Sequence, residues 1–441
     1  MEQKKVESNA GNWKEYTRVL LPPVRDLHRL DVYEKQGGYS ALRSVLKGDK
    51  WDPKSVGDAV KSAGLRGRGG AAFNAGLKWS FMPPVDERPR YLCCNGDESE
   101  PGTFKDRQLM EYNPHLVFEG ILIAAYSMSI TTTFIYVRGE YADWIKHMEG
   151  ELKKAYDKGF VGKNIMGTDF STDIVIHKGA GAYICGEETS LMESLEGKRA
   201  YPRSKPPFPA AYGVFGMPTT INNVETLACV PLIIDRGADW FAGIGAKTHA
   251  GPLLYGISGH VNRPGVYEYP SGMLMTDLIY DVCKGMRGGK KLKAVVPGGS
   301  STPVLRADMI EGVCMDSDSL RAVGSMLGTG GMLVMDEDTD MVKWLRRVSH
   351  FYHHESCGQC TPCREGTGWL EDLVGKIDDG EGNLRDLDIL IDLCYQMEGR
   401  TVCALADAAA WPVRYTIDRF RSEFEAKCRA SHVATGDLQI A

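Results

Sequence analysis

Three cysteines at intervals of three residues constrain this chain more than any other feature of its sequence. They are Cys357, Cys360 and Cys363. This spacing lets three thiolates point at one centre, and a remote fourth cysteine completes the ligand set of a [4Fe–4S] cluster. Cys403, which precedes an apolar helical pattern, is the best candidate for that fourth ligand. The pattern therefore predicts a centre that moves single electrons.

A zinc site and buried unreactive thiols are the alternatives for these cysteines. Zinc usually takes two Cys-x-x-Cys pairs or mixed Cys and His ligands, and His353 and His354 lie close to Cys357 in the sequence. Soft thiolate ligands at even spacing favour iron–sulfur over zinc. An electron-transferring cluster needs a partner, so the rest of the chain should hold an electron donor or acceptor.

The bulk properties exclude several classes of protein. A chain of 441 residues is too long for one core, so two to four domains are expected. The formal net charge of -6 argues against a nucleic-acid partner. No signal-peptide pattern opens the chain, and no apolar run reaches the ~18 residues that span a bilayer. A reducing, cytoplasmic setting is expected, where clustered cysteines bind metal or carry out redox chemistry.

A glycine-rich loop occupies residues 64–73. Its spacing matches the dinucleotide fingerprint Gly-x-Gly-x-x-Gly/Ala. That fingerprint must follow a strand, whereas a helix is predicted here over residues 52–61, so a standard first strand–helix turn is rejected. With Arg66 and Arg68 the loop can still hold phosphate through backbone N–H groups and cationic side chains. A flexible surface loop fits the composition equally well.

Strands alternate with helices in the next part of the chain. Strands are predicted over 90–95, 131–137 and 173–177, and helices over 116–128, 141–158 and 187–195. This alternation predicts a parallel sheet with helices on its faces.

Two strand ends in this region carry residues suited to a ligand, because ligands of α/β folds bind at the carboxyl ends of strands. The first strand runs into an acidic turn over 95–102, whose carboxylates repel phosphate and suit ribityl or ribose hydroxyls. The third strand runs into a glycine loop over 178–189 with Glu187 and Glu188 at a helix start. A solvated turn and a helix-dipole effect are the alternative interpretations of these acidic residues.

Two further segments offer cofactor contacts. A proline-rich segment over 199–209 presents Lys205 for phosphate or ribose and Phe208 for adenine stacking, although a rigid linker is the alternative. Asn222 and Asn223, flanked by threonines, offer donors and acceptors to a flavin. Asn222 could instead only cap a helix beginning near residue 224.

The remaining sequence predicts two smaller modules. Strands over 253–259, 265–269 and 292–297, with a helix over 274–282, indicate an α+β module, and its loop 328–331 could turn toward the cofactor. Beyond residue 338 the pattern is helical. Helices over 341–351, 366–377, 384–396 and 405–424 indicate a small bundle that holds the cluster at one end.

These motifs together resemble the flavin-binding NADH dehydrogenase subunit of bacterial respiratory complex I, the proton-pumping NADH:quinone oxidoreductase. The segments that carry the resemblance are 67–71, 95–107, 179–188, 205–209, 219–226 and 355–364, with Cys403. The resemblance implies an α/β Rossmann-like FMN- and NADH-binding domain over 1–245 and an α+β ubiquitin-like β-grasp domain over 246–335. It also implies an all-α four-helix bundle with a [4Fe–4S] cluster over 336–441.

The resemblance also assigns residues to cofactors. It implies FMN contacts at Gly67, Arg68, Lys78, Asn95, Asp97, Ser99, Tyr183, Gly186, Glu187, Asn222, Asn223 and Thr226. It implies NADH contacts at Gly69, Gly70, Phe73, Phe81, Glu100, Glu188, Lys205, Phe208 and Thr329, with Ala71 in the same loop. The implied cluster ligands are Cys357, Cys360, Cys363 and Cys403. The chain departs from the family pattern at three places. Residues 72–76 read Ala-Phe-Asn-Ala-Gly where Gly-Phe-Pro-Thr-Gly is usual, with Ala72, Asn74 and Ala75 as the changes. Gly96 stands in place of the alanine of Asn-Ala-Asp, and Ala404 stands where proline is common.

The function implied is NADH oxidation by hydride transfer to FMN, with single electrons passed on through the cluster. Glu98 and Glu188 are candidate electrostatic tuners of the flavin. The expected partners are a thioredoxin-like [2Fe–2S] subunit and a large multi-cluster iron–sulfur subunit, which would hold the chain at the cytoplasmic side of the inner membrane. The alternatives are the diaphorase subunit of a soluble NAD-linked hydrogenase or formate dehydrogenase, and a non-catalytic metal-binding scaffold.

Overall fold

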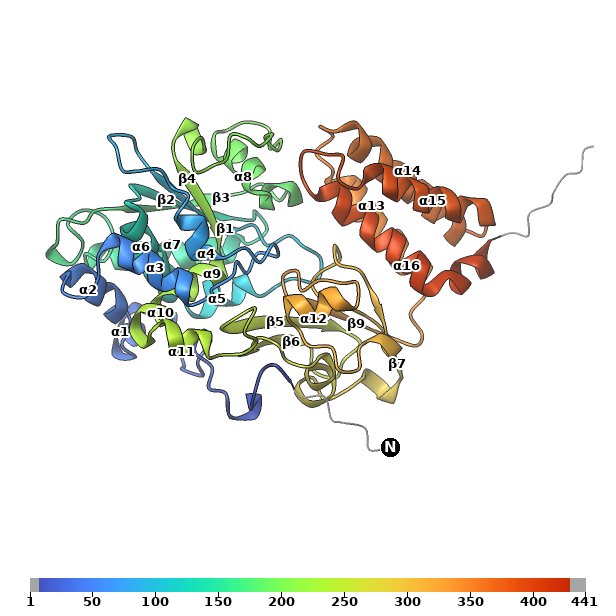
Figure 1. The fold of residues 1–441 in the computed structure, drawn as a ribbon, viewed down its shortest axis with the longest axis horizontal. Helices are drawn as coiled ribbons and strands as arrows, with labels where there is room; N and C mark the ends of the chain where they lie inside the picture. The colour runs from blue at the N-terminus through green and yellow to red at the C-terminus, as the bar shows by residue number, and fades with distance from the viewer. Residues whose placement is uncertain (1–7, 429–441) are drawn as a thin grey trace, which may run out of the picture. The chain divides into compact units, whose positions relative to one another are not determined.

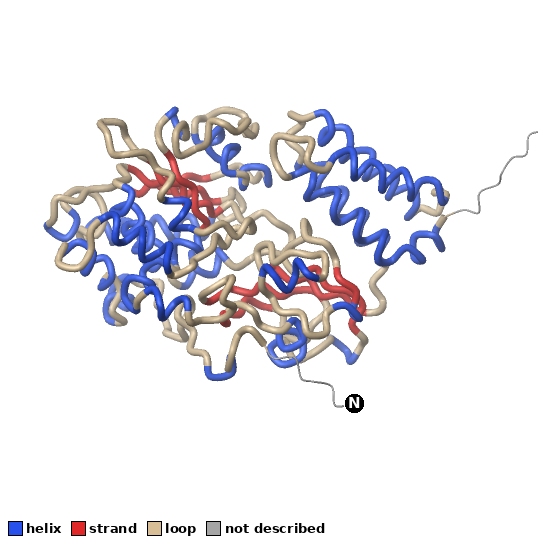
Figure 2. Tube along the Cα trace, in the orientation of Figure 1, coloured by secondary structure: helices blue, strands red, loops and turns tan. Residues whose placement is uncertain are grey.

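The computed structural model describes residues 8–428, and the chain divides into two compact units, Met1–Glu337 and Asp338–Ala441 (Figure 1). The first unit contains two separate β-sheets with helices around them, and the second unit is helical (Figure 2). No helix among residues 8–428 is both long enough and apolar enough to cross a membrane.

The first sheet has four parallel strands in the order β3-β2-β1-β4. The strands are β1 (Tyr91–Gly96), β2 (Thr132–Val137), β3 (Asp173–Lys178) and β4 (Thr219–Asn223). The three predicted strands and their parallel arrangement are confirmed. The fourth strand was not predicted, although the β-branched run at its start is typical of a strand. Because β2 and β4 flank β1, the strand order reverses between β1 and β4, where open α/β sheets bind ligands.

Both faces of this sheet are buried at its central strands, where successive side chains point to opposite faces. Leu92 and Cys94 of β1 belong to the larger hydrophobic core, while Cys93 between them belongs to a smaller core on the other face. In β2, Ile135 and Tyr136 divide between the two cores in the same way. Parallel sheets are stable in this arrangement because helices cover both of their faces.

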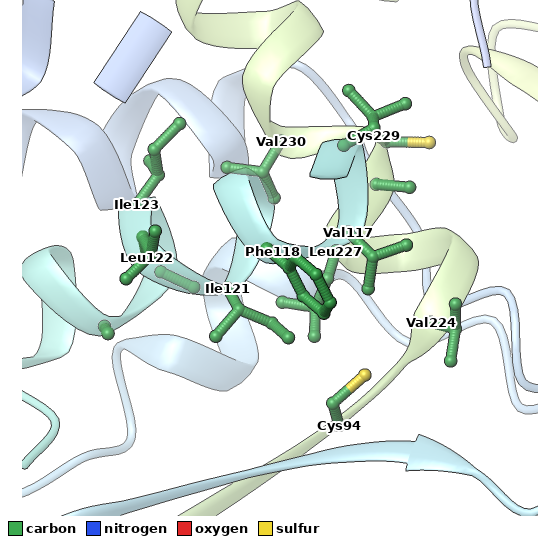
Figure 3. Packing of buried hydrophobic residues seen from close by; sticks show 14 of the residues in the cluster. Cys94, Val117, Phe118, Ile121, Leu122, Ile123, Val224, Leu227, Cys229 and Val230 are labelled. Carbon is green, nitrogen blue, oxygen red and sulfur yellow. The ribbon is translucent and has the colours of Figure 1, made fainter. Parts of the chain in front are cut away.

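The buried helix α6 (Pro114–Met128) fixes the helices next to the strand ends. Its side chains pack against α9 (Val224–Ala228) and α10 (Val230–Arg236), with Cys94 of β1 facing the same core (Figure 3). A Cβ on Gly120 would lie 1.9 Å from the Leu227 carbonyl oxygen, so only glycine permits this close approach. The packing holds the start of α9 at the carboxyl end of β4.

The other helices of the first unit surround these elements. They are α1 (Leu30–Lys35), α2 (Ser40–Lys47), α3 (Pro53–Ser62), α4 (Ala75–Trp79), α5 (Asp106–Tyr112), α7 (Ala142–Asp157), α8 (Glu188–Leu195), α11 (Ala238–Ala242) and α12 (Ser317–Ala322). Helix α3 begins where the sequence predicts, because Asp52 forms a capping box with Ser55 and Pro53 occupies the first turn. A helix therefore does precede the first glycine loop.

The second sheet is mixed, in the order β6-β5-β9-β7-β8. Its strands are β5 (Pro252–Gly259), β6 (Gly265–Pro270), β7 (Leu292–Val296), β8 (Leu305–Arg306) and β9 (Gly331–Asp336). The predicted helix over 274–282 is a π-helix, Asp277–Val282. Buried Glu268 of β6 accepts hydrogen bonds from the backbone N–H groups of residues 19–21 and from the Tyr16 hydroxyl, which ties the N-terminal segment to this sheet.

In the described part of the second unit, residues 338–428, four helices pack on one another. They are α13 (Met341–Glu355), α14 (Thr361–Asp378), α15 (Leu384–Met397) and α16 (Leu405–Lys427). Helix α14 begins at Thr361, so the predicted start at residue 366 is wrong. The reason is local: Cys360 is the N-cap and Pro362 lies in the first turn, where proline is favoured. Cys363 therefore lies on a helix.

Candidate functional site

The predicted cofactor residues of the first unit gather where β1 and β4 end. Asn95, at the end of β1, donates from Nδ2 to the Gly186 carbonyl oxygen at 2.8 Å. The backbone N–H of Arg68 donates to Thr226 Oγ1 at 2.8 Å, which joins the first glycine loop to α9. The two glycine loops and the strand ends thus form one site at the point predicted by strand order.

The first glycine loop is a closed turn held by its own backbone. The Gly67 N–H donates to the Phe73 carbonyl oxygen at 2.7 Å, and the Ala75 N–H donates to the Leu65 carbonyl oxygen at 2.8 Å. A Cβ on Gly69 would lie 3.3 Å from Asn223 Cβ, so this loop lies directly against the end of β4. Bare backbone at this position leaves room for a ligand to approach its N–H groups.

The arginine side chains of this loop bond to backbone carbonyls. Buried Arg68 donates from its guanidinium to the carbonyl oxygens of Ala250 (2.6 Å) and Pro252 (3.1 Å). Arg66 donates to the Ala72 carbonyl oxygen at 3.1 Å. Arg68 therefore holds the segment at the start of β5 in place. The groups that the loop offers to a phosphate are mainly its backbone N–H groups.

The two asparagines at the end of β4 have different partners. Asn223 caps α9, accepting from the Glu225 N–H at 3.0 Å, so the cap is Asn223 and the alternative prediction for Asn222 is wrong. Asn223 also donates to Asp106 at 2.6 Å. Asn222 accepts from the Trp79 indole N–H at 3.3 Å. Each amide is held in place by these bonds, which gives a ligand a defined set of donors and acceptors.

Glu98, from the acidic turn after β1, faces the N-terminus of α5. Its buried carboxylate accepts from the N–H groups of residues 105, 106 and 107 at 2.7, 2.8 and 3.1 Å, and from the Tyr141 hydroxyl at 3.1 Å. Burial, with the neighbouring Asp106 carboxylate, raises the pKa of Glu98 to about 7. Buried Lys105 forms ion pairs with Asp106 and Glu225 at 2.8 and 2.7 Å. A network of buried charges therefore supports the site.

A chain of three charged side chains crosses the site. Glu188 accepts from Lys78 at 2.9 Å through one oxygen and from Lys205 at 2.6 Å through the other. Burial acts to raise the pKa of Glu188, but the two lysines outweigh it and lower that pKa to about 2. Glu187 has a different role, since it caps α8 by accepting from the N–H groups of Thr189 and Ser190. Lys78, predicted to contact FMN, and Lys205, predicted to contact NADH, thus bind the same Glu188 carboxylate.

Three aromatic rings remain open to solvent beside these groups. Phe73, Phe81 and Phe208 are 46, 56 and 60% exposed, and the first two rings lie 6.0 Å apart. Large exposed aromatic side chains offer stacking surfaces to planar ligands. Farther along the turn, Ser99 donates to Asp97 at 3.3 Å, and Tyr183 donates to Glu100 at 2.6 Å.

The four predicted cluster cysteines belong to two segments of the second unit that touch. Cys357 and Cys360 precede α14, Cys363 lies in its first turn, and Cys403 leads into α16. The Val402 N–H donates to Cys360 Sγ at 3.4 Å, so the loop of Cys403 lies against the other three. Within residues 8–428, no three His, Cys, Asp or Glu side chains gather closely enough to hold a single metal ion.

The electrostatics of these cysteines suit an anionic group. Both segments end at helix N-termini, whose unpaired N–H groups and dipoles favour negative charge. For the unligated thiol of Cys363 the opposite influence is stronger, because burial and the neighbouring Cys357 and Cys360 raise its pKa. Four sulfur donors at two helix N-termini fit the iron–sulfur assignment of the motif.

Sequence reasoning missed several residues that shape these sites. Lys105 and Glu225 form the buried ion pair, and a Phe-Lys-Asp-Arg run near the acidic turn was its only sequence signal. Arg203 pairs with Glu193 and Glu196, holding the segment of Lys205 on α8. The sequence indicated the role of Arg203 only weakly, because a proline-rich run with basic residues also fits a linker.

Comparison with known proteins defines the class of protein that this fold and these sites form. Residues 60–232 match the Nuo51 FMN-binding domain, residues 254–342 match the SLBB domain, and residues 343–427 match the NADH-ubiquinone oxidoreductase-F iron–sulfur binding region. The chain is thus a flavin- and iron–sulfur-binding protein of mixed α/β structure with a helical C-terminal region.

Full-length relatives identify the family. The chain is 51% identical over 403 residues to an F subunit of NADH-quinone oxidoreductase of Rhizobium meliloti, covering 91% of this chain and 95% of that one. It is 49% identical to the corresponding F subunit of Rickettsia bellii over 402 residues, with the same coverage. The chain belongs to the family of NADH-quinone oxidoreductase F subunits. A crystal structure of an NAD⁺-reducing [NiFe]-hydrogenase matches with a TM-score of 0.80 and 34% identity, over 92% of this chain and 68% of that chain.

Replacing Ala72 by glycine should stabilise the first glycine loop. Ala72 has a φ of +52°, a left-handed conformation that is unfavourable for alanine. Ala72→Gly should raise the free energy of unfolding by roughly 0.5–1 kcal/mol, measured by thermal or urea unfolding. Ala71→Gly is the control, since Ala71 has no positive φ and its replacement should destabilise. Equal destabilisation by both changes would contradict the assignment of strain.

The raised pKa of Glu98 makes stability depend on pH. Between its ordinary pKa of 4.5 and about 7, the folded state holds a proton that the unfolded state releases. Stability therefore falls as pH rises through this window. The melting temperature of the protein relative to Glu98→Gln should decline between about pH 5 and about pH 8. Parallel pH profiles for the two proteins would show that Glu98 does not titrate there.

Proposed function

We propose that this chain oxidises NADH by hydride transfer to FMN and passes single electrons onward through a [4Fe–4S] cluster. It does so as the electron-input subunit of an NADH:quinone oxidoreductase. The observation that carries this proposal is the convergence of two glycine loops, two strand ends and the Lys78–Glu188–Lys205 chain at one site. The names of its relatives, which are F subunits of NADH-quinone oxidoreductases, support the same activity.

The residues at the strand ends fit FMN. Backbone N–H groups of the first glycine loop and the Lys78 ammonium offer donors to a phosphate, and Asn95, Asn222 and Asn223 offer amide groups to ribityl hydroxyls or a flavin ring edge. Gly186 lies directly against Asp97, since a Cβ there would lie 3.3 Å from Asp97 Oδ2. Bound FMN supplies the exchange between the two-electron chemistry of NADH and the one-electron chemistry of the cluster.

The exposed aromatic and charged groups fit NADH. Phe73, Phe81 and Phe208 present ring faces for nicotinamide or adenine. Lys205 offers a cation to phosphate or ribose, and Glu100 and Glu188 offer carboxylates to ribose hydroxyls. The protein's work is to orient the nucleotide and to set the local potential, because hydride transfer itself needs no side-chain acid or base. Glu98 and Glu188 are the proposed electrostatic tuners.

The second unit fits the cluster through Cys357, Cys360, Cys363 and Cys403. The dipoles of α14 and α16 favour the negative charge of ligated thiolates. Local electrostatics of this kind help to set the reduction potential of a cluster. The same proposal includes the finer architecture: a Rossmann-like domain over 1–245, a β-grasp domain over 246–335 and a four-helix bundle over 336–441. The sheet orders and the helical second unit support these assignments.

Two features separate this function from the diaphorase alternative. Identity with the F-subunit relatives reaches 51%, against 34% with the hydrogenase chain. The chain spans 95% of the former and 68% of the latter, so the hydrogenase chain carries sequence without a counterpart here. As a component of such a complex the chain has other subunits as partners. We infer a thioredoxin-like [2Fe–2S] subunit and a multi-cluster subunit, at the cytoplasmic side of the membrane.

Addition of NADH to the FMN-loaded protein tests the proposal. The flavin absorption should bleach under anaerobic conditions, because the nucleotide reduces the flavin directly. NADPH at the same concentration serves as a comparison. A folded protein that retains its flavin but shows no absorbance change with NADH would overturn the proposed function.

Removal of one proposed cluster ligand should separate the two redox centres. Cys403→Ala should lower the iron content from about four atoms per chain toward zero, while FMN content and flavin reduction by NADH persist. Cys428→Ala is the matched control, since Cys428 lies at the other end of α16 and is not a proposed ligand. Iron measurement and EPR spectra check this, and a Cys403→Ala protein with a full complement of iron would contradict the assignment.

A further inference from the structure

The turn between β7 and β8 contacts the cofactor site directly. The Ser301 N–H donates to Glu100 Oε1 at 2.7 Å, and Ser300 Oγ donates to the same oxygen at 3.2 Å. The other oxygen of Glu100 accepts from the Tyr183 hydroxyl at 2.6 Å. The Glu100 carboxylate is thus held between the second sheet and the loop that follows β3.

Packing fixes the stem of the Glu100 side chain as well. Gly299 has a φ of +97°, and a Cβ added there would lie 2.5 Å from Glu100 Cγ. Glycine is therefore required twice, for the backbone conformation and for the close approach. The side chain of Glu100 cannot move toward this turn, and its carboxylate cannot rotate without losing donors on both oxygens.

The turn is rigid enough to serve as a support. The Gly299 N–H donates to the Gly331 carbonyl oxygen at 2.7 Å, and the Ser300 N–H donates to the Pro101 carbonyl oxygen at 3.0 Å. Buried Thr302 closes the turn, accepting from the Gly298 N–H at 3.1 Å and donating to the Gly299 carbonyl oxygen at 2.9 Å.

A second segment of the same sheet braces the acidic turn beside Glu100. Thr329 donates from its backbone N–H to the Gly298 carbonyl oxygen at 3.1 Å, and its hydroxyl lies 2.5 Å from Thr103 Oγ1. A Cβ on Gly328 would lie 2.3 Å from the Gly298 carbonyl oxygen. The turn around Gly299 and the segment around Thr329 therefore hold residues 100–103 from one side.

We propose that Gly299, Ser300 and Ser301 form a positioning element for nucleotide recognition, which acts by holding Glu100 in its binding conformation. This inference rests on the proposed function, in which Glu100 contacts NADH. It assigns a role to the turn between β7 and β8, for which the sequence predicted none. A carboxylate that is ordered before binding loses no rotamer freedom when the nucleotide arrives, so the nucleotide binds more tightly.

Substitution of Gly299 tests the inference. In the FMN-loaded protein, Gly299→Ala should weaken NAD⁺ binding roughly tenfold, measured by calorimetry, because the added methyl displaces Glu100. FMN content and the flavin spectrum should stay unchanged. Gly288→Ala is the matched control: Gly288 also has a positive φ, +68°, but a Cβ there meets nothing within 4 Å. It should bind NAD⁺ as the unmodified protein does.

A double-mutant cycle separates positioning from general damage. Glu100→Ala should itself weaken NAD⁺ binding, and Gly299→Ala should add nothing in that background. Ser300→Ala, which removes one donor without altering the backbone, should weaken binding a few-fold and keeps the test valid if the alanine at 299 prevents folding.

The outcomes distinguish this inference from the function on which it rests. Undiminished NAD⁺ binding by both Gly299→Ala and Ser300→Ala, with the unmodified protein binding normally, overturns the positioning role alone. So does an equal loss from Gly299→Ala with and without Glu100. An unmodified, FMN-loaded protein that binds no NAD⁺ and shows no reduction by NADH overturns the proposed function and this inference together.

Discussion

Parallel pairing of β1 with β2 on one side and β4 on the other determines where every group of the first unit's site lies. In this register Cys94 lies opposite both Ile135 and Asn222, so the strands end at the same edge. The chain adds β2 and β3 on one side of β1 and then returns to add β4 on the other side. The end of β1 therefore lies beside the end of β4. The glycine loops approach the ends of β1 and β4 closely, because a glycine has no side chain to accommodate there.

Buried charge is the energetic cost of this arrangement. Glu98, Asp106 and Glu225 surround Lys105, giving three carboxylates near one ammonium. Hydrogen bonds from the start of α5 offset part of the cost at Glu98, and the ion pairs offset part at Lys105. The ion pairs of Lys105 with Asp106 and Glu225 also join the start of α5 to α9.

The sequence predicted the parts of the fold that depend on local patterns. Three strands, the start of α3 and the helices of the second unit follow from periodicity and capping residues. Strand β4 was missed because its polar end, Asn222 and Asn223, obscured the short β-branched run before it. The direction of the Arg68 side chain and the contact of Ser301 with Glu100 could not be predicted, because both depend on segments about two hundred residues apart. The glycine loops themselves were recognisable in the sequence, whereas the side chains that hold them in place were not.

Two departures from the family pattern act in opposite directions at this site. Alanine at position 72 keeps a left-handed backbone that glycine would adopt without strain. Glycine at position 96 replaces an alanine whose methyl would lie 3.0 Å from the Tyr136 carbonyl oxygen. The first departure adds conformational strain to the folded loop, and the second relieves crowding at the end of β1. Both changes concern backbone placement alone, so the donors and acceptors that the site presents to a cofactor are retained.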